Sequence, residues 1–449
     1  MLKCRSFFIG LLCAAFCQVS LALDTHMAVY VKDLNRQHVI KAADIDTYYA
    51  PSSNLKLFTA ISSYLVLKPN FTFDTSLIYD PKLVQNGSLK GNLILQFSGD
   101  PLLTHQELYQ LIATLNTKGI KKIEGNIELN TQGIDDNAYP DGVPNDQRHI
   151  CYAGPVNAIN LDRNCIHFNL FHGKPGEKVE IPAEISQGFS FVNTTITKTD
   201  PHCPIEINNK GNTFFLSGCM SPNAPPIRFN LSIPDSVDYA SKRVRKTLSA
   251  LGITLTGTIV ESNSTVNLPA IVTHHSKPLS QLLTIMLKHS DNLIANALFK
   301  AVGQHYYGGT ATWTKAIHAE KAVLQKYAGI NPKELYIYDG SGFSFYNFVT
   351  ARQIVTLLEY AHRQPELNKM MMQSLPISSV DGSLHRRIPS LKGMVHAKTG
   401  TRRDSSALSG YIIKNGHVAV FSVLVNDNFK LNNSTALEDS EVQKAAAVL

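Results

Sequence analysis

A serine and a lysine three residues apart are the first pair in the chain that could do chemistry. Ser53 and Lys56 stand where Pro51 and Ser52 are typical of a helix start and apolar residues continue to about Leu67. Helical residues three apart lie on one face, so the hydroxyl and the amine can share a proton. The pair is interpreted as a nucleophile with its base, although a Ser-x-x-Lys match alone also fits a surface helix.

The base role sets a physical requirement on Lys56. A lysine amine has a pKa near 10.4 and is almost wholly protonated at pH 7, so the pKa must fall by several units before the amine can accept a proton. Burial lowers the pKa of an amine, and so does a nearby like charge, which Lys398 would supply. We therefore expect Lys56 to be buried.

Two further motifs follow in order along the chain. Ser290-Asp291-Asn292 is a polar tripeptide between two apolar helical segments of the range 280–304, which places it to face a cleft. Lys398-Thr399-Gly400 lies within a strand predicted over 395–401. Each motif alone has an ordinary structural explanation, but the three in this order form a known set of catalytic motifs.

The N-terminus is typical of a secretory signal. Lys3 and Arg5 precede an apolar run over 7–17, and small residues follow at 20–22. The run is shorter than the roughly 20 residues that a membrane-spanning helix needs, so residues 1–22 are interpreted as a cleaved signal rather than an anchor. The mature protein is then expected in the periplasm, with at most peripheral membrane contact.

Length and charge narrow the class of protein. The chain has 449 residues, of which 44% are hydrophobic, which suggests two or three domains with real cores. Loss of Lys3 and Arg5 with the signal lowers the formal net charge from +7 to +5. A mildly basic exported protein suits an anionic partner such as the cell wall, and no basic run interleaved with aromatics indicates nucleic acid.

Four cysteines remain after the signal is removed: Cys151, Cys165, Cys203 and Cys219. An even number in an oxidising compartment predicts two disulfides, with three pairings open. The sequential pairing closes short loops, each stabilising the fold by roughly 3 kcal/mol in the chain-entropy model.

The order of predicted elements suggests an α/β core closed by both chain ends. Strands are expected at 27–31, 39–42, 395–401, 408–413 and 418–425, and the last helix at 438–448. The last two strands form a hairpin across Lys414-Asn415-Gly416. Between the first two motifs, residues 71–269 contain short β segments and one clear helix, which starts at the capping box of Thr104. We expect a catalytic domain of 23–70 and 270–449, and an inserted β-rich region of 71–269, as two subdomains.

On these motifs the chain resembles the class C, low-molecular-mass penicillin-binding proteins, the serine D-Ala-D-Ala carboxypeptidases and endopeptidases of the penicillin-binding protein 4 type. The resemblance also includes shorter pieces in the same order: 97–101, 161–165, 278–279, 339–342 and 381–384. It implies a transpeptidase/β-lactamase-like fold, an antiparallel sheet flanked by helices, with a large, mainly β insertion. It further implies peptidoglycan stem peptides ending in D-Ala-D-Ala as substrates and β-lactams as inhibitors.

The resemblance assigns a role to each motif residue. Ser53 attacks the carbonyl of the penultimate D-alanine and forms an acyl-enzyme, which water hydrolyses. The backbone N–H groups of Ser53 and Thr401 form the oxyanion hole. Ser290 passes a proton to the leaving group, and Asn292 holds Lys56 and the substrate amide. The terminal carboxylate binds at Lys398, Thr399 and Gly400.

The chain departs from the family pattern at the side-chain subsite. Phe345 stands where members that recognise diaminopimelate commonly have an arginine, and the tryptophans usual near the acidic contact, matched here by Asp146, are missing. Arg402 and Arg403 are interpreted as solvated surface arginines, with carboxylate binding as the alternative.

Three competing interpretations were weighed. A serine β-lactamase has far fewer than the 237 positions that separate Ser53 from Ser290. A catalytically idle peptidoglycan-binding protein should have lost a catalytic residue, and none of Ser53, Lys56, Ser290, Asn292 or Lys398 is missing. A metalloenzyme is disfavoured because the adjacent histidines at 274 and 275 would point to opposite sides of a strand. The sequence predicts no metal and no cofactor.

Overall fold

The computed structural model describes residues 26–182, 189–200, 202–426 and 434–449. The expected signal, residues 1–22, lies outside these ranges. Within them, no helix has both the length and the apolar character to cross a membrane.

A five-stranded antiparallel sheet is built from both ends of the chain, in the order β19-β20-β21-β1-β2. Its strands are β1 (His26–Asp33), β2 (His38–Ala43), β19 (Val395–Arg402), β20 (Ser405–Lys414) and β21 (His417–Asn426). The hairpin turn has positive φ at both Asn415 and Gly416, as an Asn-Gly turn favours. The sheet thus contains the two early and three late strands that the sequence predicts.

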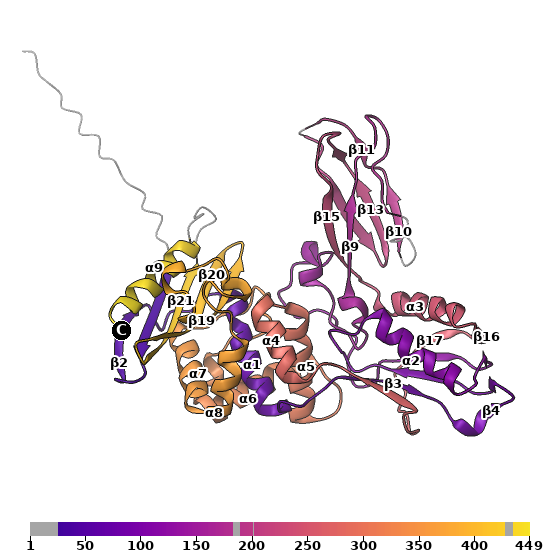
Figure 1. The fold of residues 1–449 in the computed structure, drawn as a ribbon, viewed down its shortest axis with the longest axis horizontal. Helices are drawn as coiled ribbons and strands as arrows, with labels where there is room; N and C mark the ends of the chain where they lie inside the picture. The colour runs from indigo at the N-terminus through magenta and orange to yellow at the C-terminus, as the bar shows by residue number, and fades with distance from the viewer. Residues whose placement is uncertain (1–25, 183–188, 201, 427–433) are drawn as a thin grey trace, which may run out of the picture.

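Alternate residues of the sheet face two different cores, because successive side chains of a strand point to opposite faces. On β21, Val420 and Leu424 face the core shared with the helices, whereas Phe421 and Val423 face the core beneath α9 (Ser434–Ala447). The helical core contains α1 (Lys56–Leu67), α4 (Leu279–His289), α5 (Asn292–Tyr307), α6 (Trp313–Ala328), α7 (Ala351–Arg363) and α8 (Pro365–Ser374). Figure 1 shows the sheet between these helices and α9.

The segment between the first two motifs forms the other half of the molecule, with a core drawn from residues 77–253. Its main sheet has the order β17-β8-β6-β3-β18, from β3 (Asp74–Ile78), β6 (Leu93–Gln96), β8 (Ile127–Asn130), β17 (Ile259–Ser262) and β18 (Val272–His275). A second sheet contains β4 (Val84–Gln85), β5 (Ser88–Leu89), β7 (Lys122–Ile123) and β16 (Thr254–Leu255). The expected boundary at 269/270 falls just before β18, which pairs with β3.

Two helices pack within this region, α2 (His105–Thr117) and α3 (Ser236–Ala250). Thr104 closes the expected capping box of α2 with Glu107. Only one helix was expected here, so α3 is a second helix that the sequence pattern did not predict. Its buried face consists of scattered residues such as Tyr239, Val244 and Leu248 among many charged ones, which blurs the helical periodicity.

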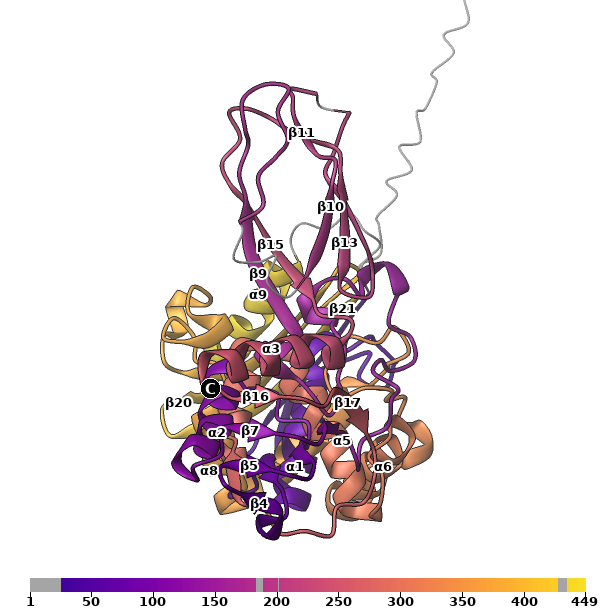
Figure 2. The ribbon, with the colours of Figure 1, turned by 90° about the vertical axis from the view of Figure 1, so that its right-hand side faces the viewer.

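A narrow arm of short strands projects from this half, as Figures 1 and 2 show. It contains β9 (Cys165–Leu170), β10 (Ser190–Asn193), β11 (Ile196–Thr197), β12 (Glu206–Lys210), β13 (Thr213–Ser217), β14 (Cys219–Met220) and β15 (Ile227–Ser232).

Candidate active site

Ser53 and Lys56 meet at the start of the first helix, where a 3-10 turn over Ser52–Leu55 leads into α1. Lys56 Nζ lies 3.0 Å from Ser53 Oγ, and 2.7 Å from both Asn292 Oδ1 and the Ser341 carbonyl oxygen. The Lys56 side chain is fully buried. Burial lowers its pKa to about 7, against the opposing charges of Asp339 and Asp291. The hydroxyl therefore lies beside an amine that can be neutral near neutral pH.

The backbone just before Ser53 is held in a strained conformation. Ser52 has a φ of 46°, a left-handed value that costs a non-glycine residue about 1–2 kcal/mol. Its hydroxyl lies 2.7 Å from Ser405 Oγ on β20, and its carbonyl packs against Gly342. A Cβ on Gly342 would lie 1.8 Å from that carbonyl oxygen, so only glycine fits. These contacts fix the direction of Ser53.

The second motif occupies the break between α4 and α5. Ser290 adopts the left-handed conformation that ends α4, and Asp291 caps α5 by accepting from the backbone N–H of Ile294. Asn292 is consequently the first residue of α5, and its Nδ2 donates to the Tyr152 carbonyl at 2.8 Å. Arg163 forms an ion pair with Asp291. Both Tyr152 and Arg163 come from the segment between the first two motifs, so that segment supports the second motif.

The third motif lies on the edge strand β19. Lys398 is fully buried, and its Nζ donates to the Thr399 carbonyl at 2.6 Å. Burial and the charge of Lys56 lower the Lys398 pKa well below its usual value. The Thr399 hydroxyl lies 2.6 Å from Ser383 Oγ. A Cβ on Gly400 would lie 3.0 Å from the Ser53 backbone nitrogen, so the glycine lets the strand approach Ser53.

A cleft of about 540 Å³ is lined by residues of the first two motifs and by Thr401, which directly follows the third. Its walls are Ser52, Ser53, Gln147, Tyr152, Ser290, Asn292, Gly342, Phe343, Phe345, Thr401, Arg402, Arg403 and Asp404. Of the residues singled out in the sequence, Lys56 and residues 398–400 are buried and do not line the cleft. Asp146 is exposed on the turn Asn145–Gln147 and is not part of the wall, whereas its neighbour Gln147 is.

Arg402 differs from the expected solvated arginine. Its side chain is only 9% exposed, because its guanidinium lies 4.2 Å from the centre of the Phe345 ring and pairs with Asp404 at 2.7 Å. Arg403 is exposed at the rim. The aromatic residue at the position of the family's arginine therefore has an arginine stacked on it from β19.

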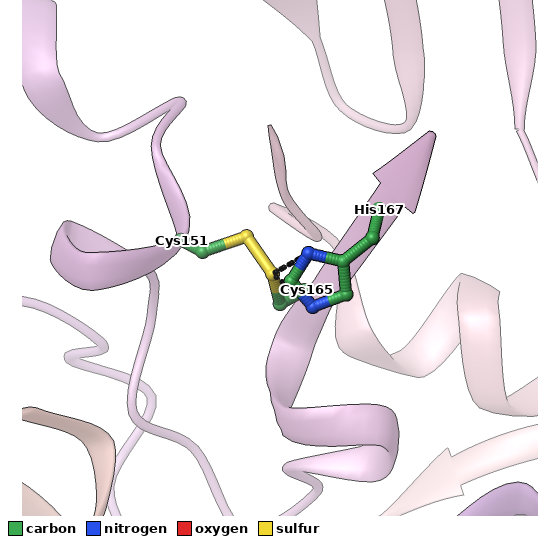
Figure 3. A group of neighbouring side chains, drawn as sticks. All are labelled: Cys151, Cys165 and His167. Carbon is green, nitrogen blue, oxygen red and sulfur yellow. Dashed lines mark hydrogen bonds between the residues drawn. A yellow bond between two sulfur atoms is a disulfide. The ribbon is translucent and has the colours of Figure 1, made fainter. Parts of the chain in front are cut away.

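The cysteines pair sequentially, Cys151 with Cys165 and Cys203 with Cys219. Figure 3 shows the first bridge with His167 beside it. The group resembles a metal-ligand cluster, but its two sulfurs are bonded to each other and are not thiolates. The Cys151–Cys165 bridge lies next to Tyr152 and close to Arg163, the two residues of the insertion that hold the second motif.

Tyr152, Arg163 and Ser341 are parts of the site that the sequence did not predict. Tyr152 and Ser341 act through backbone carbonyls, which leave no trace in residue type. Arg163 and Ser341 lie within two of the short pieces that carry the family resemblance, 161–165 and 339–342. Membership in these pieces was the one sequence feature that could have indicated a role in the site.

Comparison with known proteins agrees with this geometry. Residues 18–447 match the model of the D-Ala-D-Ala carboxypeptidase 3 (S13) family. The chain is 32% identical over 413 residues to the D-alanyl-D-alanine carboxypeptidase DacB of Haemophilus influenzae, covering 90% of this chain and 85% of that protein. It is 25% identical over 408 residues to a D-alanyl-D-alanine carboxypeptidase of Actinomadura sp. (strain R39), covering 84% and 75%.

Among solved structures, the crystal structure of penicillin-binding protein 4 from H. influenzae superposes with a TM-score of 0.87 at 30% identity, covering 94% of this chain and 96% of that one. A second structure of that protein contains a novel β-lactam and gives a TM-score of 0.82. The expected fold class is confirmed by these matches.

Proposed function

Because the chain belongs to the D-Ala-D-Ala carboxypeptidase 3 (S13) family of peptidases, we propose that it is an exported hydrolase that removes the terminal D-alanine from peptidoglycan stem peptides. The family resemblance seen in the motifs is confirmed, and so is the prediction of an enzyme of this class. The observation that carries the proposal is the buried Lys56 amine, with its pKa lowered to about 7, at 3.0 Å from Ser53 Oγ in a cleft.

In the first step, Ser53 Oγ bonds to the carbonyl carbon of the penultimate D-alanine, and its proton moves to the neutral amine of Lys56. Negative charge develops on the carbonyl oxygen. We propose that the backbone N–H groups of Ser53 and Thr401 donate to that oxygen. The close approach of β19 to Ser53 at Gly400 supports this arrangement.

The tetrahedral intermediate then collapses as the C–N bond breaks, and the leaving amine takes up a proton through Ser290. Asn292 keeps Lys56 in place throughout, because its Oδ1 accepts from Nζ. The D-alanine departs, and water hydrolyses the acyl-enzyme on Ser53.

The terminal carboxylate of the substrate is bound by Lys398 and Thr399. Burial and the charge of Lys56 lower the pKa of Lys398. A bound carboxylate acts in the opposite direction, because it favours the ammonium form. Compounds without a carboxylate at this position lose that interaction.

Export to the periplasm is supported by the charged and apolar N-terminus and by the two disulfides, which persist in oxidising compartments. Acylation of Ser53 by β-lactams is supported by the H. influenzae protein, whose structure contains one. Cleavage of D-alanyl cross-links uses the same groups and differs only in what fits on the leaving side.

The intact mass of the protein after mixing with benzylpenicillin tests the proposal. A lasting one-to-one adduct is expected for the wild type and for Ser63→Ala, a buried serine on the same helix, but not for Ser53→Ala. Release of free D-alanine from a pentapeptide, beside cleavage of a cross-linked dimer, separates the two peptidase activities. An adduct that clears within seconds favours a β-lactamase, and no adduct overturns the proposal.

A further inference from the structure

Among the residues that the structure describes, five aromatic side chains line a shallow groove that is open to the surface. Its volume is about 430 Å³, within the range of small-molecule sites. The five side chains of this aromatic groove are Tyr48, Tyr336, Tyr338, Tyr346 and Phe348. Four of them are at least 37% exposed, and Tyr346 is 53% exposed. Single exposed apolar side chains are normal on a protein surface, whereas several gathered in one patch mark a binding surface.

The rings are set by a rigid framework. Tyr336 and Phe348 are bridged through the backbone, and Tyr338 N–H donates to Asn347 Oδ1 at 2.8 Å. The rings form two edge-to-face pairs, Tyr48 with Tyr336 at 5.2 Å and Tyr338 with Tyr346 at 5.5 Å between ring centres. Two short extended segments thus turn their aromatic side chains outward, while the residues between them, such as Ile337 and Asn347, are buried.

The same loop also builds the active site. Asp339 is fully buried and accepts from the Ser341 hydroxyl, from three backbone N–H groups and from Asn347 Nδ2. Ser341 in turn accepts from Lys56 through its carbonyl. The consecutive residues Phe345 and Tyr346 line the cleft and the aromatic groove respectively. The groove and the cleft are therefore lined by neighbouring residues of one short segment.

We propose that the aromatic groove binds the saccharide chain to which the stem peptide is attached. The inference rests on the proposed function, because that substrate joins a peptide to a glycan. The face of a sugar ring presents C–H groups that pack on the negatively polarised face of an aromatic ring, and tyrosine hydroxyls can bond to sugar hydroxyls. No charged side chain of the described ranges lines the groove, which suits an uncharged sugar better than an acidic or basic segment. Rigid tyrosines lose little conformational entropy on binding.

Glycan strands freed of their peptides are the probe, titrated into the full chain by calorimetry. Binding is expected for the wild type and for Tyr307→Ala, a matched exposed tyrosine on α5. We expect it to weaken by about fivefold or more in Tyr336→Ala/Tyr346→Ala and also in Tyr346→Ala alone, since truncation of a contributing aromatic costs at least that.

Kinetics provide the second measurement. The double variant should hydrolyse intact peptidoglycan with a raised KM, and should match the wild type in acylation by benzylpenicillin and in hydrolysis of a sugar-free pentapeptide. Equal KM values on peptidoglycan and equal glycan binding overturn the inference. The inference is also overturned if the two substitutions abolish a concentration-dependent dimer or binding to lipid vesicles instead of glycan binding. Failure of the proposed function shows separately, as an absence of acylation in the wild type.

Discussion

Burial of the Lys56 amine makes acylation depend on pH near neutrality. The amine can accept the Ser53 proton only when neutral, and its pKa is lowered to about 7 by burial. The neutral fraction falls tenfold for each pH unit below that value and saturates above it. The rate constant for acylation by benzylpenicillin should therefore rise from pH 5 to about 7 and then level off.

Stopped-flow acylation from pH 5 to 9 provides the measurement, with the intact fold checked at each pH by circular dichroism. Lys56→Met should abolish the profile together with the activity, since no base remains. A rate that keeps rising to pH 10 would mean that Lys56 titrates like an exposed lysine and is not the base.

The lack of a side chain at Gly342 decides the geometry around Ser52. Its φ is +83°, and a Cβ would collide with the Ser52 carbonyl oxygen. Gly342→Ala should slow acylation on the order of 100-fold, because the displaced Ser52 misdirects the nucleophile. The acylation rate and the thermal unfolding midpoint are both measured.

Gly393→Ala is the control for this substitution. Gly393 has a similar φ of +78° but nothing within 4 Å of the added carbon. The Gly393→Ala variant should lose about 1–2 kcal/mol of stability from backbone strain alone and should acylate at the wild-type rate. Equal acylation rates in the two variants would argue against a positioning role for Gly342.

Among the elements, the disulfide between Cys151 and Cys165 brackets the segments that hold the second motif. Tyr152 accepts from Asn292 and Arg163 pairs with Asp291, and both neighbour the bridge. The double variant Cys151→Ser/Cys165→Ser should lose roughly 3 kcal/mol of stability and also acylate more slowly. Unfolding by urea and acylation by benzylpenicillin measure the two effects.

The second bridge is the matched comparison, because it closes a loop of similar length in the projecting arm. Cys203→Ser/Cys219→Ser should lose a similar amount of stability and acylate normally. If both double variants acylate at the wild-type rate, the first bridge has only a structural role.

Elements with strong local signals were predicted well from the sequence. The helix that follows Ser53 ends at Leu67 as expected, the capping box of Thr104 closes, and the hairpin at Asn415-Gly416 forms. Helix α3 was missed, since its apolar face is interrupted by charges. The support of Asn292 by Tyr152 could not be predicted, because a backbone carbonyl 140 residues away has no local signature.

For the whole molecule, the division into a catalytic domain of 23–70 and 270–449 and an insertion of 71–269 stays a prediction. Phe73 and Ser276 offer a place to test it, because the Ser276 N–H donates to the Phe73 carbonyl at 2.8 Å. A two-residue Asn-Gly turn can therefore replace residues 74–275. Lys300 loses its partner Asp135 in this deletion and is changed to Met.

The shortened chain should fold cooperatively, because the helices and the five-stranded sheet retain their own core. It should acylate slowly, because Tyr152 and Arg163 are gone. Circular dichroism and thermal unfolding test the first expectation, and the penicillin adduct tests the second. A chain that does not fold would show that the insertion is an integral part of the catalytic domain.

The strand order of the catalytic sheet also governs when the nucleophile can become active. Strand β1 pairs with β21, so its partner is made almost 400 residues later in synthesis. A growing chain that already contains Ser53 and Lys56 lacks the strand that carries Lys398 and the edge that faces Ser53. Hydrolysis must wait until residues 395–426 have been made, and a product that ends before them should be inert.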